Sequence, residues 1–136
     1  MEQTNRRKHV IQMNPREADT VTGIVNSIRG WQGLNQTHIT ERKNKWNVTD
    51  NEILTALRDG QIVEVHNNVP EEVRAVVRAN IGLRSVCVTV SLYTKSIITM
   101  WVNTVDDNHF TLKTEEYQWK VNLMQLLAGF TPDESF

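Results

Sequence analysis

The chain has 136 residues, a mass of 15.7 kDa and a formal net charge of −1 at pH 7. This length is typical of one domain with one hydrophobic core, and the near-zero charge argues against a general binder of polyanions. One cysteine, Cys87, excludes an internal disulfide framework and a multi-cysteine zinc site. No secretory signal and no apolar stretch of bilayer length are present, so we expect a cytoplasmic protein without membrane contact.

Charge is unevenly distributed along the chain. Residues 1–58 contain nine Lys or Arg against six Asp or Glu, whereas residues 59–136 contain six against ten. The positive part is a candidate for phosphate contacts, because local fields matter more than net charge. A solvated surface of mixed charge explains the same distribution equally well.

The N-terminal part predicts a short strand followed by a helix. Residues 1–8 are polar and are expected to be mobile, and residues 9–13 have the composition of a short strand. Asn14 and Pro15 are typical of the cap and first position of a helix, which Gly30 would end. Apolar residues recur at helical spacing between them. They are Ala18, Val21, Ile24, Val25 and Ile28.

Two further helices are expected before residue 61. Thr37 would cap a helix over residues 37–46. Thr49 and Glu52 form the pattern of a capping box, in which each side chain binds the backbone of the other residue. Gly60 would end this third helix.

After residue 60 the apolar period changes from 3.6 to 2, which predicts strands. Four strands are expected, over residues 61–66, 73–79, 84–92 and 96–104. Their short connections predict hairpins and hence an antiparallel meander. On the last strand, one face is expected to carry Ile98, Met100 and Val102, and the other Ile97, Thr99, Trp101 and Asn103.

The C-terminal segment is less regular. Residues 106–108 are expected to form a loop, and residues 110–119 fit either a strand or irregular structure. Residues 121–128 predict a short apolar helix, followed by a frayed tail. The expected fold is α+β, with N-terminal helices packed on a four-stranded antiparallel sheet and a short C-terminal helix. We divide it into an extension (1–35), a core (36–104) and a C-terminal segment (105–136) within one domain (1–136).

Common catalytic and metal-binding motifs are missing from the sequence. It has no glycine-rich phosphate loop, no HExxH and no GxSxG, and its four histidines lack ligand spacing, so we expect no metal and no cofactor. Cys87 lies among valines and is expected to be a buried structural thiol. His9, His66 and His109 are expected at the surface or in turns.

One constellation resembles a known family. His38 and Arg42 lie one helical turn apart, and the passage Val48-Thr49-x-x-Glu52-Ile53-x-x-Ala56-Leu57-x-x-Gly60-x-Ile62-x-Glu64 follows. This order is similar to the small-domain family of the BrnT-type toxins, within the barnase, EndoU, colicin and RelE class of ribonucleases. The resemblance covers residues 36–104 and is motif-like over residues 38–64. The chain departs from it at Trp46-Asn47, where the family often has a basic residue and glycine, and in its N-terminal extension.

The resemblance implies a toxin-like endoribonuclease that cleaves tRNA or mRNA without metal, through attack of the ribose 2′-OH on its own phosphate. Histidine is the side-chain type that titrates near neutrality, so His38 would act as base or acid. Arg42 would hold a phosphate by a bidentate fork. Partners would be RNA and a cognate antitoxin, immunity or other protein; the oligomeric state is not predicted. The candidate catalytic residues are His38, Arg42, Arg78 and Thr99, and the candidate substrate-binding residues are Arg74, Lys45, Trp101 and Asn103.

Alternatives without catalysis stay open. His38 and Arg42 fit an exposed helix pair, Arg74 and Arg78 fit the solvent face of an edge strand, and Trp101 fits a core position. The near-neutral charge, the extra N-terminal segment and the lack of a full acid and base set fit a non-catalytic binding or inhibitor module. A nucleic-acid-binding accessory domain is a third hypothesis. It would use Arg6, Arg7, Lys8, Arg42, Lys43 and Lys45.

Overall fold

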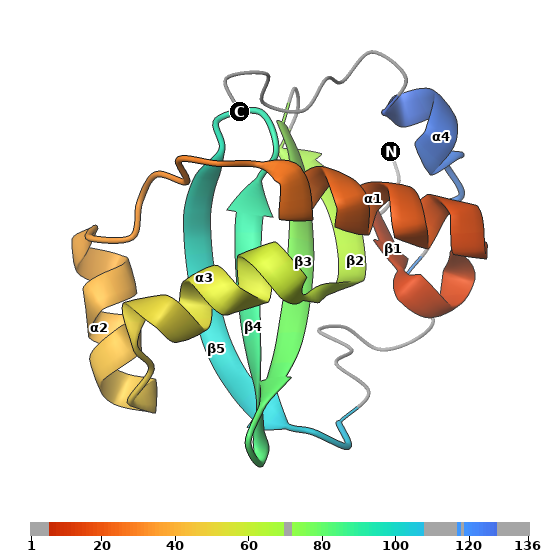
Figure 1. Cartoon of the computed structure of the whole chain (residues 1–136). Coiled ribbons are helices and arrows are strands. Elements are labelled where there is room, and N and C mark those ends of the chain that lie inside the picture. The colour runs from red at the N-terminus through yellow and green to blue at the C-terminus, as the bar shows by residue number, and fades with distance from the viewer. Residues whose placement is uncertain (1–5, 70–71, 108–116, 118, 128–136) are drawn as a thin grey trace.

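The computed structural model describes residues 6–69, 72–107, 117 and 119–127. In these residues the fold is α+β, with one sheet of five strands in the order β1-β2-β3-β4-β5 (Figure 1). The strands are β1 (Arg7–His9), β2 (Gln61–Val69), β3 (Glu72–Ile81), β4 (Arg84–Ser91) and β5 (Ser96–Thr104). The helices are η1 (Val10–Gln12, a 3-10 turn), α1 (Pro15–Ser27), α2 (Thr37–Trp46), α3 (Asp50–Asp59) and α4 (Leu123–Leu126).

The antiparallel meander is confirmed, with one strand more than expected. β1 pairs with β2, and Lys8 lies opposite Val65. The predicted strand over residues 9–13 is wrong, because the strand ends at His9 and η1 follows it. The expected mobility of residues 1–8 is also wrong for Arg7 and Lys8, since β-pairing and buried polar contacts hold both of them.

The helices pack mainly on one face of the sheet. α3 contacts β3 and β4, α1 contacts β2 and α3, and α2 contacts β5. Figure 1 shows α1 and α3 crossing this face, with α2 beside β5 at the edge of the sheet. Apolar side chains of the helices and of alternate strand positions form the core between these layers. Its largest fully buried members are Ile39, Ile53, Leu57, Leu92, Ile97, Met100 and Leu123.

The predicted helix starts are confirmed at two of three helices. Asn14 and Glu17 form a capping box at α1, and Thr49 and Glu52 form the predicted one at α3. At α2, however, Thr37 is the first helical residue, and Gln36 occupies the cap position without a side-chain bond to the helix.

Two glycines allow close approaches that a Cβ atom would prevent. Gly60 ends α3 as predicted, and a Cβ built there would lie 2.7 Å from the carbonyl oxygen of Arg78 and closer still to that of Ala56. Gly33 has a φ of 95°, and its Cβ would lie 2.9 Å from the carbonyl oxygen of Ile97. The loop before α2 therefore rests directly on β5.

A β-bulge changes the predicted faces of β5. Val90 lies opposite Ile97, whereas Thr89 lies opposite Thr99, so Ile98 is an extra residue between the two pairs. Ile97 consequently points into the core and is 1% exposed, instead of sharing a face with Thr99 as predicted.

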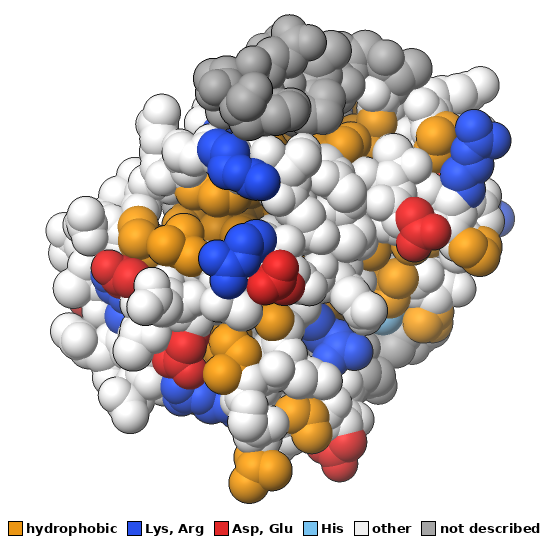
Figure 2. Space-filling view, in the orientation of Figure 1, with side chains coloured by type: hydrophobic (Ala, Val, Ile, Leu, Met, Phe, Trp, Pro, Cys, Tyr) orange, Lys and Arg blue, Asp and Glu red, His pale blue; other side chains and the backbone are white. Residues whose placement is uncertain are grey.

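Several predictions fall outside the described residues or differ at their limits. Most of the ambiguous segment 110–119, His109 and the tail from residue 128 lie outside them. α4 is confirmed but covers only Leu123–Leu126. None of the described helices has the length and apolarity needed to cross a membrane. Figure 2 shows the surface over the helices, where acidic and basic side chains alternate around exposed apolar ones.

Candidate functional site

The face of the sheet that points away from α1 and α3 is polar. Strand alternation places Ser85, Cys87, Thr89 and Ser91 on this face of β4, as the sequence predicts. The register places on the same face the five predicted site residues that come from strands. They are Arg74, Arg78, Thr99, Trp101 and Asn103.

Rows of residues across the strands give the spacing on this face. Arg78, Cys87 and Trp101 lie in one row, so the Cα atoms of Arg78 and Trp101 are about 10 Å apart, at two strand spacings. Thr99 belongs to the neighbouring row. The two rows place the indole of Trp101 and the hydroxyl of Thr99 on the edge strand β5, with the cation of Arg78 two strands away on β3.

His38 reaches this edge from α2. Its Nε2 lies 3.1 Å from Oγ1 of Thr99, and the pair is exposed. The two residues are 61 positions apart in sequence and meet because α2 packs beside β5. The imidazole nitrogen can donate to the hydroxyl or accept from it, and both arrangements fix the orientation of the ring.

Arg42 and Lys45 continue from His38 along α2, four and seven positions later. Arg42 is half-buried and has no hydrogen bond or ion pair with any described residue, so its guanidinium is available to a ligand. Lys45 is exposed, with its Nζ 5.2 Å from the ring centroid of Trp46. Lys43 is occupied instead, because its Nζ donates to Asp50 at 2.7 Å and to the carbonyl oxygen of Leu34 at 3.0 Å.

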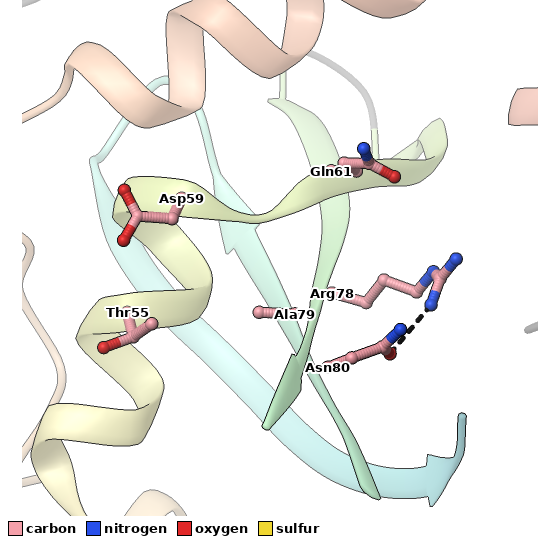
Figure 3. Close-up of a pocket in the computed structure, with 6 residues that line it drawn as sticks. All are labelled: Thr55, Asp59, Gln61, Arg78, Ala79 and Asn80. Atoms are coloured by element: carbon pink, nitrogen blue, oxygen red, sulfur yellow. Dashed lines mark hydrogen bonds between the residues drawn. The ribbon is translucent and has the colours of Figure 1, made fainter. Parts of the chain in front are cut away.

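Arg78 borders a cavity of about 320 Å³ at one end of β2 and β3 (Figure 3). Its Nη1 donates to Oδ1 of Asn80 at 3.0 Å, and both side chains point away from α3, whereas Ala79 points toward it. The partner is a neutral amide, and among the described residues no carboxylate forms an ion pair with Arg78. Its positive charge is therefore not neutralised in the described part of the chain.

Arg74 differs from Arg78. Its Nη2 lies 3.0 Å from Oε2 of Glu72, so its charge is already paired. The suggestion that the two arginines lie on an edge strand is wrong, because β3 lies at the centre of the sheet.

Trp101 and Asn103 lie next to each other on the polar face of β5. Trp101 is half-buried and does not belong to the apolar core, so the suggested core position is wrong. Asn103 Nδ2 lies 3.9 Å from the Sγ of Cys87. Cys87 is fully buried, as predicted, and this burial raises the pKa of its thiol to about 12, which disfavours the reactive thiolate near neutrality.

A buried polar cluster at β1 and β2 is not predicted by the sequence analysis. Glu64 is fully buried, Arg7 Nη1 donates to its Oε2 at 3.0 Å, and Tyr117 Oη donates to its Oε1 at 3.0 Å. His9 and His66 are also buried here, contrary to the surface or turn positions expected for them. The signal in the sequence is an acid inside the apolar run Ile62–Val65.

This cluster is separate from the His38–Thr99 contact. Glu64 lies in the same cross-strand row as Thr99, but three strand spacings away, or about 14 Å between Cα atoms. The described residues include no group of three or more His, Cys, Asp or Glu side chains placed to hold a metal ion.

The basic residues near the N-terminus are engaged inside the protein. Arg7 binds Glu64, and Lys8 Nζ lies 2.8 Å from Oε2 of Glu17 in a pair that is almost completely buried. Neither side chain presents a free cation to a nucleic acid, which weakens the hypothesis of an accessory domain.

Comparisons with known proteins give no relative. The scan against family models, the search of curated proteins and the search of solved structures each returned no match. The resemblance to the BrnT-type toxins therefore depends only on His38, Arg42 and the passage that follows them in the sequence.

Proposed function

We propose that the chain is a metal-independent endoribonuclease of the toxin type, with its site at the edge where α2 meets β5. The contact between His38 Nε2 and Thr99 Oγ1 at 3.1 Å carries the proposal. It places an oriented, exposed imidazole beside the cationic side chains of α2 and the polar face of the sheet. An imidazole in this setting suits the proton transfers of RNA cleavage.

The roles follow from the chemistry of 2′-OH attack. His38 moves the proton of the attacking or leaving oxygen, and Thr99 holds the ring in position. Arg42 and Arg78 supply positive charge to the phosphorane, since neither is neutralised by a described carboxylate. Trp101 offers an indole on which an unpaired base stacks.

The remaining predicted residues have smaller parts in this proposal. Lys45 and Asn103 contact the substrate at either side of the His38–Thr99 pair. Arg74 is assigned no role in the reaction, because Glu72 already neutralises it. The partners of this function are RNA and a protein that blocks the site in the producing cell.

Purified protein mixed with total RNA, followed by sequencing of the new 5′ ends, tests the proposal. We expect His38→Ala to lower cleavage by about 100-fold or more, the usual contribution of a general acid or base, and Thr99→Val to lower it less. Asn44→Ala, an exposed change on the same helix, is the matched control and should cleave like the wild type. Equal cleavage by wild type and His38→Ala would reject the proposed role of His38.

A binding module without catalysis is the second candidate. The group that His38 contacts favours this candidate, because it is the hydroxyl of Thr99 and not a carboxylate. Glu64 lies in the same cross-strand row as Thr99, but it is too far from His38 to form an acid and base pair with it. This candidate predicts no cleavage by any variant. It also predicts a complex, with RNA or with a partner protein, that Arg42→Ala weakens.

A further inference from the structure

A second cavity lies on the helical side of the molecule, between the segment that follows α1 and the C-terminal half of α3. Its volume is about 490 Å³, within the range of about 300–1,000 Å³ that is typical of ligand pockets. None of its lining residues belongs to the His38–Thr99 surface. The inference drawn from it therefore goes beyond the proposed nuclease and does not depend on it.

The interior of the cavity is apolar. Ile28 and Leu57, which are 3% and 1% exposed, form its base where the core reaches the surface. Trp31, Leu34 and Leu54 are partly buried and form its walls. Figure 2 shows exposed apolar side chains gathered in this region of the helical face, with basic side chains next to them.

Hydrogen bonds within the chain fix the walls of the cavity. Asn26 Nδ2 donates to the carbonyl oxygen of Leu57 at 2.8 Å, which sets the distance between α1 and α3. The backbone of Gln32 pairs with the start of β5. Its N–H donates to the carbonyl oxygen of Lys95 at 2.9 Å, and its carbonyl oxygen accepts from the N–H of Ile97 at 2.8 Å. The segment that carries Trp31 and Leu34 is thus attached to the sheet, so the cavity is preformed.

Two arginines complete the lining. Arg29 Nη1 donates to the carbonyl oxygen of Asn26 at 3.0 Å, which keeps its guanidinium at the end of α1. Arg58 Nε lies 3.3 Å from Asp59, but their side chains are 62% and 61% exposed. An ion pair so exposed contributes little, so Arg58 can exchange this partner for a ligand.

We propose that this cavity binds a small amphipathic anion, namely a carboxylate with an apolar body. The body lies against Trp31, Leu34 and Leu54, and the carboxylate binds the guanidinium groups of Arg29 and Arg58. A partner helix is the less suitable occupant. It would need a groove with anchors over several turns, and the α3 side of this cavity extends only from Leu54 to Arg58.

Decanoate, below its micelle concentration, is the probe, and the ¹⁵N-labelled full chain is the sample. We expect a saturable shift of the Trp31 indole N–H signal and little change at Trp101. Arg58→Glu should weaken binding by about tenfold, the loss expected for one charge-assisted hydrogen bond. Arg16→Glu, the same charge change at an exposed position of α1 outside the cavity, should leave the affinity unchanged.

Three results would overturn the proposal. The first is no shift of Trp31 at any concentration of decanoate below micelle formation. The second is binding that does not depend on the arginines and the carboxylate. It would appear as equal affinity of the cavity for decyltrimethylammonium and decanoate, or as equal weakening of decanoate binding by Arg58→Glu and Arg16→Glu. The third is binding of an acidic amphipathic helical peptide where decanoate fails, which would assign the cavity to a protein partner.

Discussion

The guanidinium of Arg84, at the start of β4, binds both carboxylate oxygens of Glu52 at 3.1 Å. It also donates to the carbonyl oxygens of Trp46 at 2.7 Å and Asn47 at 2.8 Å. Glu52 belongs to the capping box of α3, and the two carbonyls end α2. One side chain from the sheet therefore joins the end of α2, the helix that carries His38, to the start of α3.

Replacing Arg84 with Met should destabilise the protein by about 2 kcal/mol. The change removes charge-assisted bonds from a part-buried carboxylate and leaves two carbonyl oxygens without their donor. Urea unfolding measures the free energy. Arg58→Met, which breaks the exposed pair with Asp59, is the control and should change stability by less than about 0.5 kcal/mol. Equal losses in the two variants would contradict a special role for Arg84.

Glu17 is expected to hold the C-terminal segment in place. Its Oε2 accepts from Lys8 Nζ at 2.8 Å and from the backbone N–H of Leu123 at 2.9 Å. Glu17→Gln should cost about 3 kcal/mol, because a buried ammonium group loses its counter-charge. Hydrogen exchange at the Leu123 amide should also accelerate. Asp19→Asn, an exposed acid-to-amide change on the same helix, should alter neither quantity.

Stability should fall between pH 6.5 and pH 4 because of His66. Burial, followed by the charges of Arg7 and Arg74, lowers the pKa of His66 from 6.5 to about 4, while Glu72 opposes this effect. In this window the unfolded chain binds a proton that the folded protein does not. The free energy of unfolding therefore decreases as the pH falls, by about 3 kcal/mol at most.

His66→Gln removes this titration and should flatten the dependence of stability on pH above pH 5. The carboxylates of Glu17, Glu52 and Glu72 have lowered pKa values, so their contributions are lost only below about 4.5. Urea unfolding of both proteins from pH 5 to 7 makes the comparison. A slope that persists unchanged in the variant would assign it to other groups.

Two glycines should respond in opposite directions to alanine. Gly60→Ala should destabilise by about 2 kcal/mol or more, because the new methyl group meets the carbonyl oxygens of Ala56 and Arg78. An added Cβ at Gly23, inside α1, would have no atom within 4 Å apart from its chain neighbours and the backbone of its own helix. Gly23→Ala should stabilise by about 0.5–1 kcal/mol through helix propensity. Thermal unfolding of both variants measures the change in stability. A shift of the unfolding temperature in the same direction in both variants would refute this account.

Local patterns in the sequence determined much of the fold. The Asn14-Pro15 start, the capping box of Thr49 and Glu52, the stop at Gly60 and the alternation after it predicted α1, α3 and the antiparallel meander. These features depend on bonds and periods within a few residues, so they can be recognised without the rest of the chain. The buried state of Cys87 followed in the same way from its valine neighbours.

Long-range pairing decided what the sequence could not. The strand β1 exists because Arg7–His9 pairs with β2, more than fifty positions away, and the bulge at Ile98 depends on the register with β4. His38 was a candidate from its spacing to Arg42 and from the family resemblance, but only the packing of α2 beside β5 brought it to Thr99. The burial of Glu64 and His66, and the cavity beside Trp31, likewise arise from surfaces that meet only in the folded chain.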